Sequence, residues 1–127
     1  MSFLKNMFGT SDGGEKVSKI GWRPLTDLGQ LNEIIDSSVE KPLLIFKHST
    51  RCGVSRMVLS QFENEFDAEQ KITPYFLDLL VHRDISNAIA ERFGVMHQSP
   101  QLIVIKDGKA VYNTSHSDID GGNLPSF

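Results

Sequence analysis

The chain has 127 residues, a length that suits one domain built around one hydrophobic core. Hydrophobic residues make up 39% of the chain and charged residues 23%, and both fractions are ordinary for a globular protein. The formal net charge of −3 at pH 7 offers no basic surface, so we expect no nucleic acid partner. No apolar run approaches the ~20 residues that span a bilayer, so we expect no stable membrane insertion.

Residues 1–19 are predicted to form a flexible N-terminal tail, because they end in a polar, glycine-rich stretch. They lack the apolar segment and cleavage site of a secretory signal. Cys52 is the one cysteine of the chain and cannot form an internal disulfide. This favours a reducing compartment, and we predict a cytoplasmic location. A single cysteine also excludes a cysteine-rich zinc site, and the histidines show no short ligand spacing, so we predict no metal.

The domain predicted over residues 20–120 begins with an edge strand, a helix and a buried strand. Pro24 places residues 22–25 at a sheet edge, because proline donates no hydrogen bond to a strand ladder. The next segment carries apolar residues at helical spacing, namely Leu28, Leu31 and Ile35. Residues 43–46, LLIF, form an apolar run that is too short for a helix and typical of a strand buried on both faces.

A second helix is predicted directly after Cys52, and its apolar stripe consists of Val58, Leu59, Phe62 and Phe66. Residues 74–79 form the next strand. A third helix is predicted from about Asp84, with Gly94 placed to end it in a left-handed cap.

Residues 102–105 are a further buried strand, and Asp107-Gly108 predicts a two-residue hairpin turn before a returning strand at 110–112. Residues 121–127 are predicted to be a C-terminal tail. The order β-α-β-α-β-α-β-β predicts an α/β fold with a central mixed sheet of four to five strands and helices on both faces.

Cys52 follows a buried strand and a short polar loop, and it opens a helix. Unpaired N–H groups and the positive end of the helix dipole stabilise an anion such as a thiolate there. Arg51 and Arg56 add positive charge, Ser55 has a hydroxyl placed to donate to the sulfur, and Gly53 lets another backbone approach closely. Because open α/β sheets bind ligands at the carboxyl ends of their strands, we predict that Cys52 is a redox-active thiol.

The order of elements, with Cys52 at a strand-to-helix junction and Ser99-Pro100 before the last buried strand, resembles the thioredoxin fold. The resemblance implies a cis bond between Ser99 and Pro100, and a Ser99 main chain that pairs with a bound substrate chain. Two positions depart from the dithiol pattern. Ser55 replaces the resolving cysteine of Cys-x-x-Cys, and Phe46 stands where thioredoxins hold a buried acid. Both departures argue against reduction by an intramolecular dithiol.

A more specific resemblance, to the YtxJ family of monothiol bacilliredoxins, is carried by LLIFKHSTRCGVS (43–55), R-x-I-S-N (83–87), HQSPQLIVIKDGKAVY (97–112) and SHS (115–117). It implies a monothiol thiol–disulfide oxidoreductase that removes bacillithiol from S-thiolated proteins through a mixed disulfide on Cys52. Bacillithiol, or a similar low-molecular-weight thiol, is then a co-substrate and not a bound cofactor. The implied partners are S-thiolated clients and a thiol or redoxin that restores Cys52. Family members often carry Pro where Gly53 stands.

Bacillithiol carries carboxylates, so cations near the thiol are candidate substrate contacts. Arg83 is the first candidate, because a guanidinium fits a carboxylate bidentately. Lys47, His97 and His116 follow it. Each has a plainer alternative: an ion pair with a neighbouring acid for Arg83, and hydrogen bonds to local backbone or partial burial for the histidines.

Three other functions stay open at this point. A non-catalytic thioredoxin-like module would use the Ser99-Pro100 groove to hold extended chains without redox chemistry. A redox sensor in stress responses would have Cys52 merely oxidised and capped. A monothiol glutaredoxin-like iron–sulfur carrier would need ligands shared between chains, and it ranks last.

Overall fold

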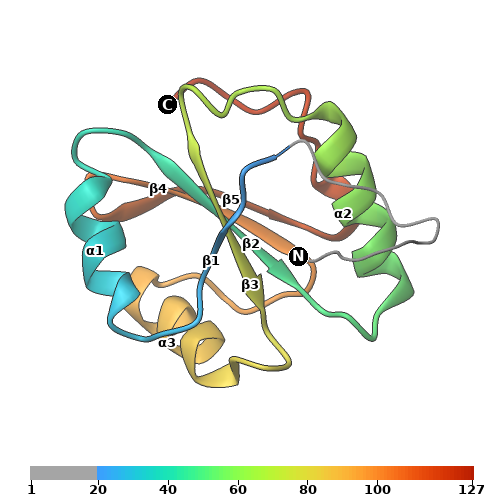
Figure 1. The fold of residues 1–127 in the computed structure, drawn as a ribbon, viewed down its shortest axis with the longest axis horizontal. Coiled ribbons are helices and arrows are strands. Elements are labelled where there is room, and N and C mark those ends of the chain that lie inside the picture. The colour runs from blue at the N-terminus through green and yellow to red at the C-terminus, as the bar shows by residue number, and fades with distance from the viewer. Residues whose placement is uncertain (1–19) are drawn as a thin grey trace.

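The computed structural model describes residues 20–127, and the tail predicted over residues 1–19 lies outside them. Within the described part the strands are β1 (Arg23–Pro24), β2 (Leu43–His48), β3 (Thr73–Asp78), β4 (Gln101–Lys106) and β5 (Lys109–Ser115). The helices are α1 (Gln30–Ser37), α2 (Gly53–Glu65), α3 (Arg83–Phe93) and the short 3-10 helix η1 (His116–Asp118) (Figure 1). No helix in this range is long and apolar enough to cross a bilayer.

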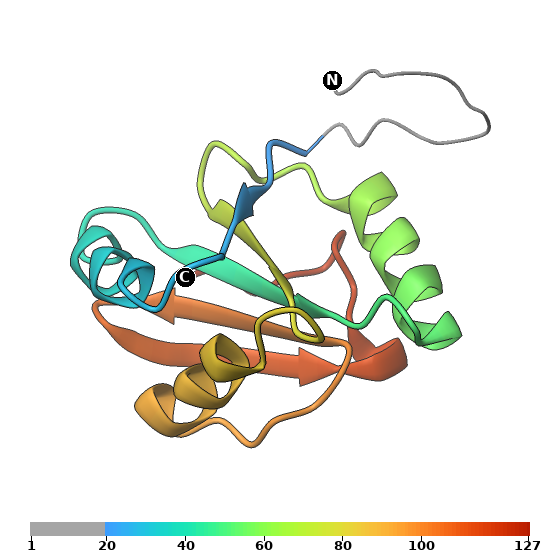
Figure 2. The same ribbon diagram turned by 60° about the horizontal axis from the view of Figure 1, so that its bottom comes forward.

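The described strands form one five-stranded sheet in the order β1-β3-β2-β4-β5. The strands β1, β3 and β2 run parallel, whereas β4 is antiparallel to β2, and β5 is antiparallel to β4. Helices α1 and α3 cover one face and α2 covers the other (Figure 2). The predicted thioredoxin-like α/β fold, with a mixed sheet between helices, is therefore confirmed.

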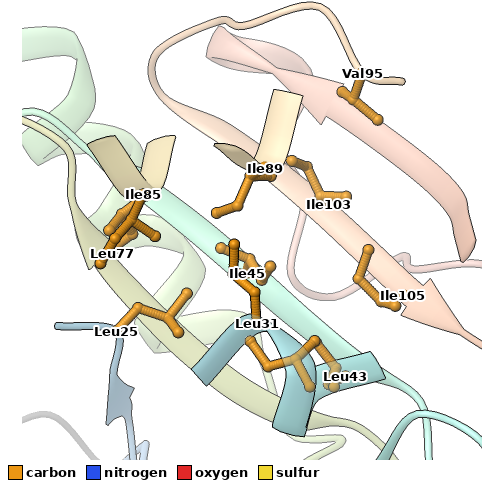
Figure 3. Packing of buried hydrophobic residues seen from close by; sticks show 11 residues of the cluster. Leu25, Leu31, Leu43, Ile45, Leu77, Ile85, Ile89, Val95, Ile103 and Ile105 are labelled. Carbon is orange, nitrogen blue, oxygen red and sulfur yellow. The ribbon is translucent and has the colours of Figure 1, made fainter. Parts of the chain in front are cut away.

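Strand β2 lies at the centre of this arrangement, and all six of its residues are buried. Because side chains alternate along a strand, Leu43 and Ile45 pack on the face covered by α1 and α3 (Figure 3). Leu44 and Phe46 pack on the face covered by α2. Helices pack on both faces of β2, and β3 and β4 pair with its two edges, so the end of this strand has a fixed position. Cys52 lies four residues after that end.

Helix α1 begins later than the spacing of its apolar residues predicts. The Gln30 side chain accepts hydrogen bonds from the backbone N–H groups of Thr26 at 2.7 Å and Asp27 at 3.0 Å, which holds a turn ahead of the helix. Leu28 therefore precedes the helix and is exposed, while Leu31 and Ile34 are the buried residues. Leu31 is buried as predicted, whereas Ile34 takes the buried position predicted for Ile35.

The turn predictions are confirmed. Gly94 ends α3 in the left-handed region with φ 65°, where a residue with a side chain would be strained. Asp107 and Gly108 have φ of 53° and 74°, as a two-residue hairpin turn between β4 and β5 requires.

The segment predicted as a C-terminal tail packs against the domain. Leu124 and Phe127 contact the core cluster beneath α2, and the rings of Phe127 and Tyr112 lie 5.7 Å apart. A Cβ built at Gly121 would come within 3.0 Å of the Phe62 carbonyl oxygen, so the chain passes close along α2 here. The packed part of the molecule thus extends past residue 120.

Truncating Phe62 tests the α2 face of the core. The Phe62 ring lies 5.0 Å from Phe66, 5.5 Å from Phe46 and 5.9 Å from Trp22, and Phe62 is 1% exposed. We expect Phe62→Ala to lower the free energy of unfolding by about 3–5 kcal/mol, measured by denaturant titration. The control Val39→Ala, at a 66% exposed position, should change it by less than about 0.5 kcal/mol. Equal effects of the two variants would contradict this packing.

Candidate redox site

Cys52 is the N-cap residue of α2, with an extended backbone at φ −101° and ψ 120°, and its side chain is half-buried. Its side chain makes no capping hydrogen bond, so it leaves the first N–H groups of α2 without a partner from this residue. Cys52 therefore combines two features that a reactive thiol needs: partial exposure of the residue to solvent and a position at a helix N-terminus, which favours negative charge.

Hydrogen bonds around the loop hold Cys52 in place. The Cys52 N–H donates to the Ser49 carbonyl at 3.2 Å, and the Arg56 N–H donates to the Cys52 carbonyl at 3.1 Å. The Arg56 guanidinium donates to the Thr50 carbonyl at 3.0 Å, which ties the second turn of α2 to the loop. Arg56 thus has a structural partner in addition to the charge that we predicted it to supply.

Ser55 has a different set of contacts from the one we predicted. It is fully buried, and its hydroxyl oxygen lies 2.8 Å from His48 Nδ1 and accepts the Ser49 N–H at 3.1 Å. Among the hydrogen bonds of the described residues, none joins Ser55 to Cys52 Sγ. The hydroxyl faces His48 at the end of β2, and the role predicted for Ser55 as a donor to the sulfur is revised accordingly.

His48 lies beneath the N-terminus of α2, 5% exposed and with its ring 5.6 Å from Phe76. Burial lowers the pKa of its imidazole, which Asp78 raises in part and Arg56 lowers further. Burial therefore favours the neutral form of this imidazole.

Lys47 lies on the opposite face of β2, beneath α3, and it is fully buried. Its ammonium donates to the Ser86 carbonyl at 3.2 Å and lies 3.3 Å from His97 Nδ1. The Ser86 hydroxyl lies 3.2 Å from the same ring nitrogen. This geometry revises the role predicted for Lys47. It does not present its charge to a ligand, and it holds instead the loop that carries His97.

Burial also sets the ionisation of this second cluster. It lowers the pKa of Lys47 from 10.5 to about 8. It lowers the pKa of His97 too, and the positive charges of Lys47 and Arg83 act in the same direction. With His97 neutral, the single lone pair of Nδ1 accepts a hydrogen bond from the Lys47 ammonium, and the Ser86 hydroxyl lies beside the same nitrogen. The exposed His97 side chain is thereby held by contacts with buried Lys47 and Ser86.

The Ser99-Pro100 bond is cis, as the resemblance to thioredoxins implies. Lys47 pairs with Gln101 in the β2–β4 register, so the turn before β4 lies at the same end of the sheet as the loop that leads to Cys52. The Ser99 hydroxyl is buried and has no hydrogen-bond partner within the described part of the chain. The His116 N–H donates to the Pro100 carbonyl at 3.0 Å, which places η1 beside the same turn.

The other predicted residues lie at the surface around this end of the sheet. Arg51 and Gly53 are exposed beside the thiol, and a Cβ built at Gly53 would meet only the Arg56 guanidinium, at 4.0 Å. Arg83 is exposed at the first residue of α3 and is close enough to act on the charge of His97. Within residues 20–127, no three His, Cys, Asp or Glu side chains gather as metal ligands would.

Sequence analysis missed the hydrogen-bonding roles of His48, Ser86 and Asp78. The signal for His48 was present, because strand alternation puts it on the same face as Phe46, beneath the helix that begins near Cys52. The signal for Ser86 was absent, because nothing in the sequence shows which turn of α3 lies over Lys47.

A family model for monothiol bacilliredoxin BrxC matches residues 23–124. The chain is similar to a solved candidate oxidoreductase with a thioredoxin fold, at 32% identity over 77% of this chain and 85% of that one, with a TM-score of 0.67. It is 20% identical to Malassezia sympodialis thioredoxin over 84% of this chain and 89% of that one, with a TM-score of 0.62. Fasciola hepatica thioredoxin is also 20% identical to this chain, over 74% of this chain and 86% of that one, with a TM-score of 0.59. The two thioredoxins support the fold alone.

The lowered pKa of Lys47 predicts a specific dependence of stability on pH. The folded chain releases this proton near pH 8, whereas the unfolded chain holds it to about pH 10.5, so the stability of the wild type rises with pH between these values. The variant Lys47→Met lacks this proton and serves as the reference. We expect the free energy of unfolding of the wild type, minus that of the variant, to rise by about 1–2 kcal/mol from pH 8 to pH 10.5, after allowance for solvent screening. Denaturant titrations of both proteins measure this, and a difference that stays flat across the window would contradict it.

Proposed function

Because the chain belongs to the monothiol bacilliredoxin family, we propose that Cys52 removes bacillithiol from S-thiolated client proteins. At the coarser level the chain is a thiol–disulfide oxidoreductase with a thioredoxin fold. The observation that carries the finer proposal is the position of the only cysteine: half-buried, at the N-terminus of α2, and at the same end of the sheet as the cis Ser99-Pro100 turn.

The proposed reaction has two exchange steps. In the first, the Cys52 thiolate attacks the bacillithiol sulfur of a client mixed disulfide. The bond between the client and bacillithiol sulfurs breaks, the client leaves as a thiolate that takes a proton from water, and Cys52 keeps bacillithiol. In the second, an outside thiolate attacks the bacillithiol sulfur of this adduct and Cys52 leaves as a thiolate. A serine at position 55 cannot resolve the adduct, so the adduct persists until the outside thiol or a redoxin arrives.

The surface at this end of the sheet supports a protein as the client. Val54 in the first turn of α2 is 46% exposed, Val81 after β3 is 69% exposed, and Met96 before the cis-proline turn is 80% exposed. These apolar side chains lie on three segments that converge on the end of the sheet where Cys52 lies. Exposed apolar side chains around a reactive group favour docking of another chain.

Exposed basic side chains in the same region support an anionic thiol such as bacillithiol. The guanidinium groups are Arg83, which opens α3 beside His97, and Arg51, which precedes Cys52. The side chain of His116 follows β5 next to Pro100. Arg83 remains the first candidate for a bacillithiol carboxylate, because its side chain is exposed and forms no ion pair with an acid among residues 20–127.

Intact mass spectrometry tests the proposed adduct. The full chain is incubated with bacillithiol disulfide and, in parallel, with glutathione disulfide. We expect one bacillithiol adduct on the wild type, faster formation than with glutathione, and no adduct on Cys52→Ala. An unmodified wild type, or an equal adduct on the variant, would remove the proposal. A second incubation uses a client protein that carries labelled bacillithiol. If Cys52 is capped by bacillithiol disulfide but the client keeps its label, Cys52 is a sensor and the proposed removal of bacillithiol is wrong.

Kinetics with a bacillithiolated reporter protein test the proposed carboxylate contact. We expect Arg83→Gln to raise KM about tenfold with a smaller change in kcat, because a lost charge-assisted hydrogen bond costs roughly 1–2 kcal/mol. Lys109→Gln is the matched control, since Lys109 lies at the β4–β5 hairpin, at the opposite end of β4 from the cis-proline turn. Equal KM changes in both variants would indicate general electrostatics and would contradict a specific contact.

A further inference from the structure

The chain buries a positive charge that the exchange steps above do not use. Lys47 is fully buried near the end of β2, although a lysine is rarely buried in a folded protein. Its ammonium donates to the Ser86 carbonyl at 3.2 Å and lies 3.3 Å from Nδ1 of His97. Burying a charge costs free energy that an apolar side chain would not cost. The buried ammonium therefore calls for a role at His97, the exposed side chain that it contacts.

The contacts at Nδ1 determine which ring nitrogen of His97 carries the proton. An ammonium has three donors and no acceptor, so Nδ1 is the acceptor of the bond from Lys47. The hydroxyl of Ser86, which can also donate, lies 3.2 Å from the same nitrogen. In the neutral ring the proton is then on Nε2. Among the hydrogen bonds of residues 20–127, none uses this Nε2–H, so it is left to donate to a ligand.

The backbone on either side of His97 is also held in place. The side chain of Gln101, which is 1% exposed, donates to the Met96 carbonyl at 2.9 Å and accepts the Gln98 N–H at 3.3 Å. Gln101 pairs with Lys47 in the β2–β4 register, so two adjacent strands hold this loop and its ring. His97 is thus an exposed donor that is already ordered, and a ligand that binds it does not have to order it.

The charges around His97 favour an anion as that ligand. Lys47 on β2 and Arg83 on α3 both place positive charge near the ring, and both act with burial to lower the pKa of His97. Within the described part of the chain, neither Lys47 nor Arg83 forms an ion pair with an acid. A carboxylate only accepts hydrogen bonds, and it would supply the missing negative charge to two groups that only donate.

We propose that Lys47 is a positioning residue that keeps the proton of His97 on Nε2, where the N–H and the Arg83 guanidinium together bind a carboxylate of the low-molecular-weight thiol. This inference rests on the proposed function of Cys52, and it specifies how the transferred thiol is recognised. Lys47 acts through His97 and does not touch the ligand. Its burial then has a reason, because an apolar residue at this position would leave the His97 proton free to move to Nδ1.

Two reactions of the same thiol test the carboxylate contact. Bacillithiol disulfide carries carboxylates, whereas iodoacetamide is uncharged, and no client protein is present in either reaction. We expect His97→Ala to slow formation of the bacillithiol adduct about fivefold at pH 7.5, because it loses one hydrogen bond to a charged group. Its alkylation by iodoacetamide should keep the wild-type rate. Equal slowing of both reactions would indicate a changed thiol and overturn the contact, as would two unchanged rates.

His82→Gln is the matched control for these rates, since it removes another imidazole at the same end of the sheet. Both of its rates should equal those of the wild type. If it slows adduct formation as much as His97→Ala does, the effect is not specific to His97 and the contact is overturned. Thermal unfolding confirms that each variant is folded.

Nuclear magnetic resonance of the isotope-labelled full chain tests the role of Lys47 without any thiol substrate. We expect the wild type at pH 7.5 to hold the His97 proton on Nε2. The double variant Lys47→Met/Ser86→Ala removes both donors to Nδ1. We expect it to show a fraction of the Nδ1–H form and a raised pKa of His97, because a facing positive charge is gone. Lys109→Met, which removes a charge at the β4–β5 hairpin, should change neither.

A wild type that holds the proton on Nδ1 would overturn the positioning role, and this spectrum decides the point even if the double variant does not fold. A folded double variant with an unchanged tautomer and pKa of His97 would overturn it as well. If the wild type forms the adduct and His97→Ala forms it equally fast, the inference fails while the proposed function stands. If the wild type forms no adduct, the proposed function and the carboxylate contact both fail.

Discussion

The site depends on the burial of β2 on both faces and along both edges. β3 and β4 bond to its edges, α1 and α3 cover one face, and α2 covers the other. Because this strand has no freedom to shift, the loop from Ser49 to Arg51 delivers Cys52 to one place, the first position of α2. An irregular loop could not hold one sulfur at a helix N-terminus so closely. The position of the thiol is therefore a consequence of core packing.

The last two residues of β2 are polar, and each is satisfied on a different face. Lys47 bonds to Ser86 and His97 beneath α3, whereas His48 bonds to Ser55 beneath α2. Buried polar groups cost free energy unless they are paired, so both pairs constrain the segments that they join. One pair holds the loop before the cis-proline turn, and the other holds the start of α2. The two segments that flank the thiol are thus fixed through adjacent residues of one strand.

Much of the fold was predictable, because the strongest signals are local. The LLIF run, the helical spacing after Cys52 and the Asp107-Gly108 turn predict elements that the structure confirms. The start of α1 was not predictable from apolar spacing, because the Gln30 side chain holds a turn ahead of it. The position of the thiol followed from the order of elements, and the cis bond before β4 followed from the resemblance to thioredoxins.

The polar contacts beneath the thiol were not predictable to the same degree. Lys47 looked like a surface cation because a lysine at a strand end is usually solvated. Its burial depends on Ser86 of α3 lying directly above it, and only three-dimensional packing shows that. Ser55 looked like a donor to the sulfur, since i+3 spacing at a helix start permits it. The competing partner, His48, lies seven residues away in sequence and 2.8 Å away in space.

The central claim is that bacillithiol moves from a client to Cys52. A single-turnover mixture of a bacillithiolated protein with excess reduced wild-type chain, quenched with acid and weighed intact, tests it most directly. The account predicts that the client loses the mass of bacillithiol at the same rate at which the chain gains it, and that Cys52→Ala leaves the client unchanged. A client that keeps its modification, or that loses it while Cys52 never carries it, would contradict the account.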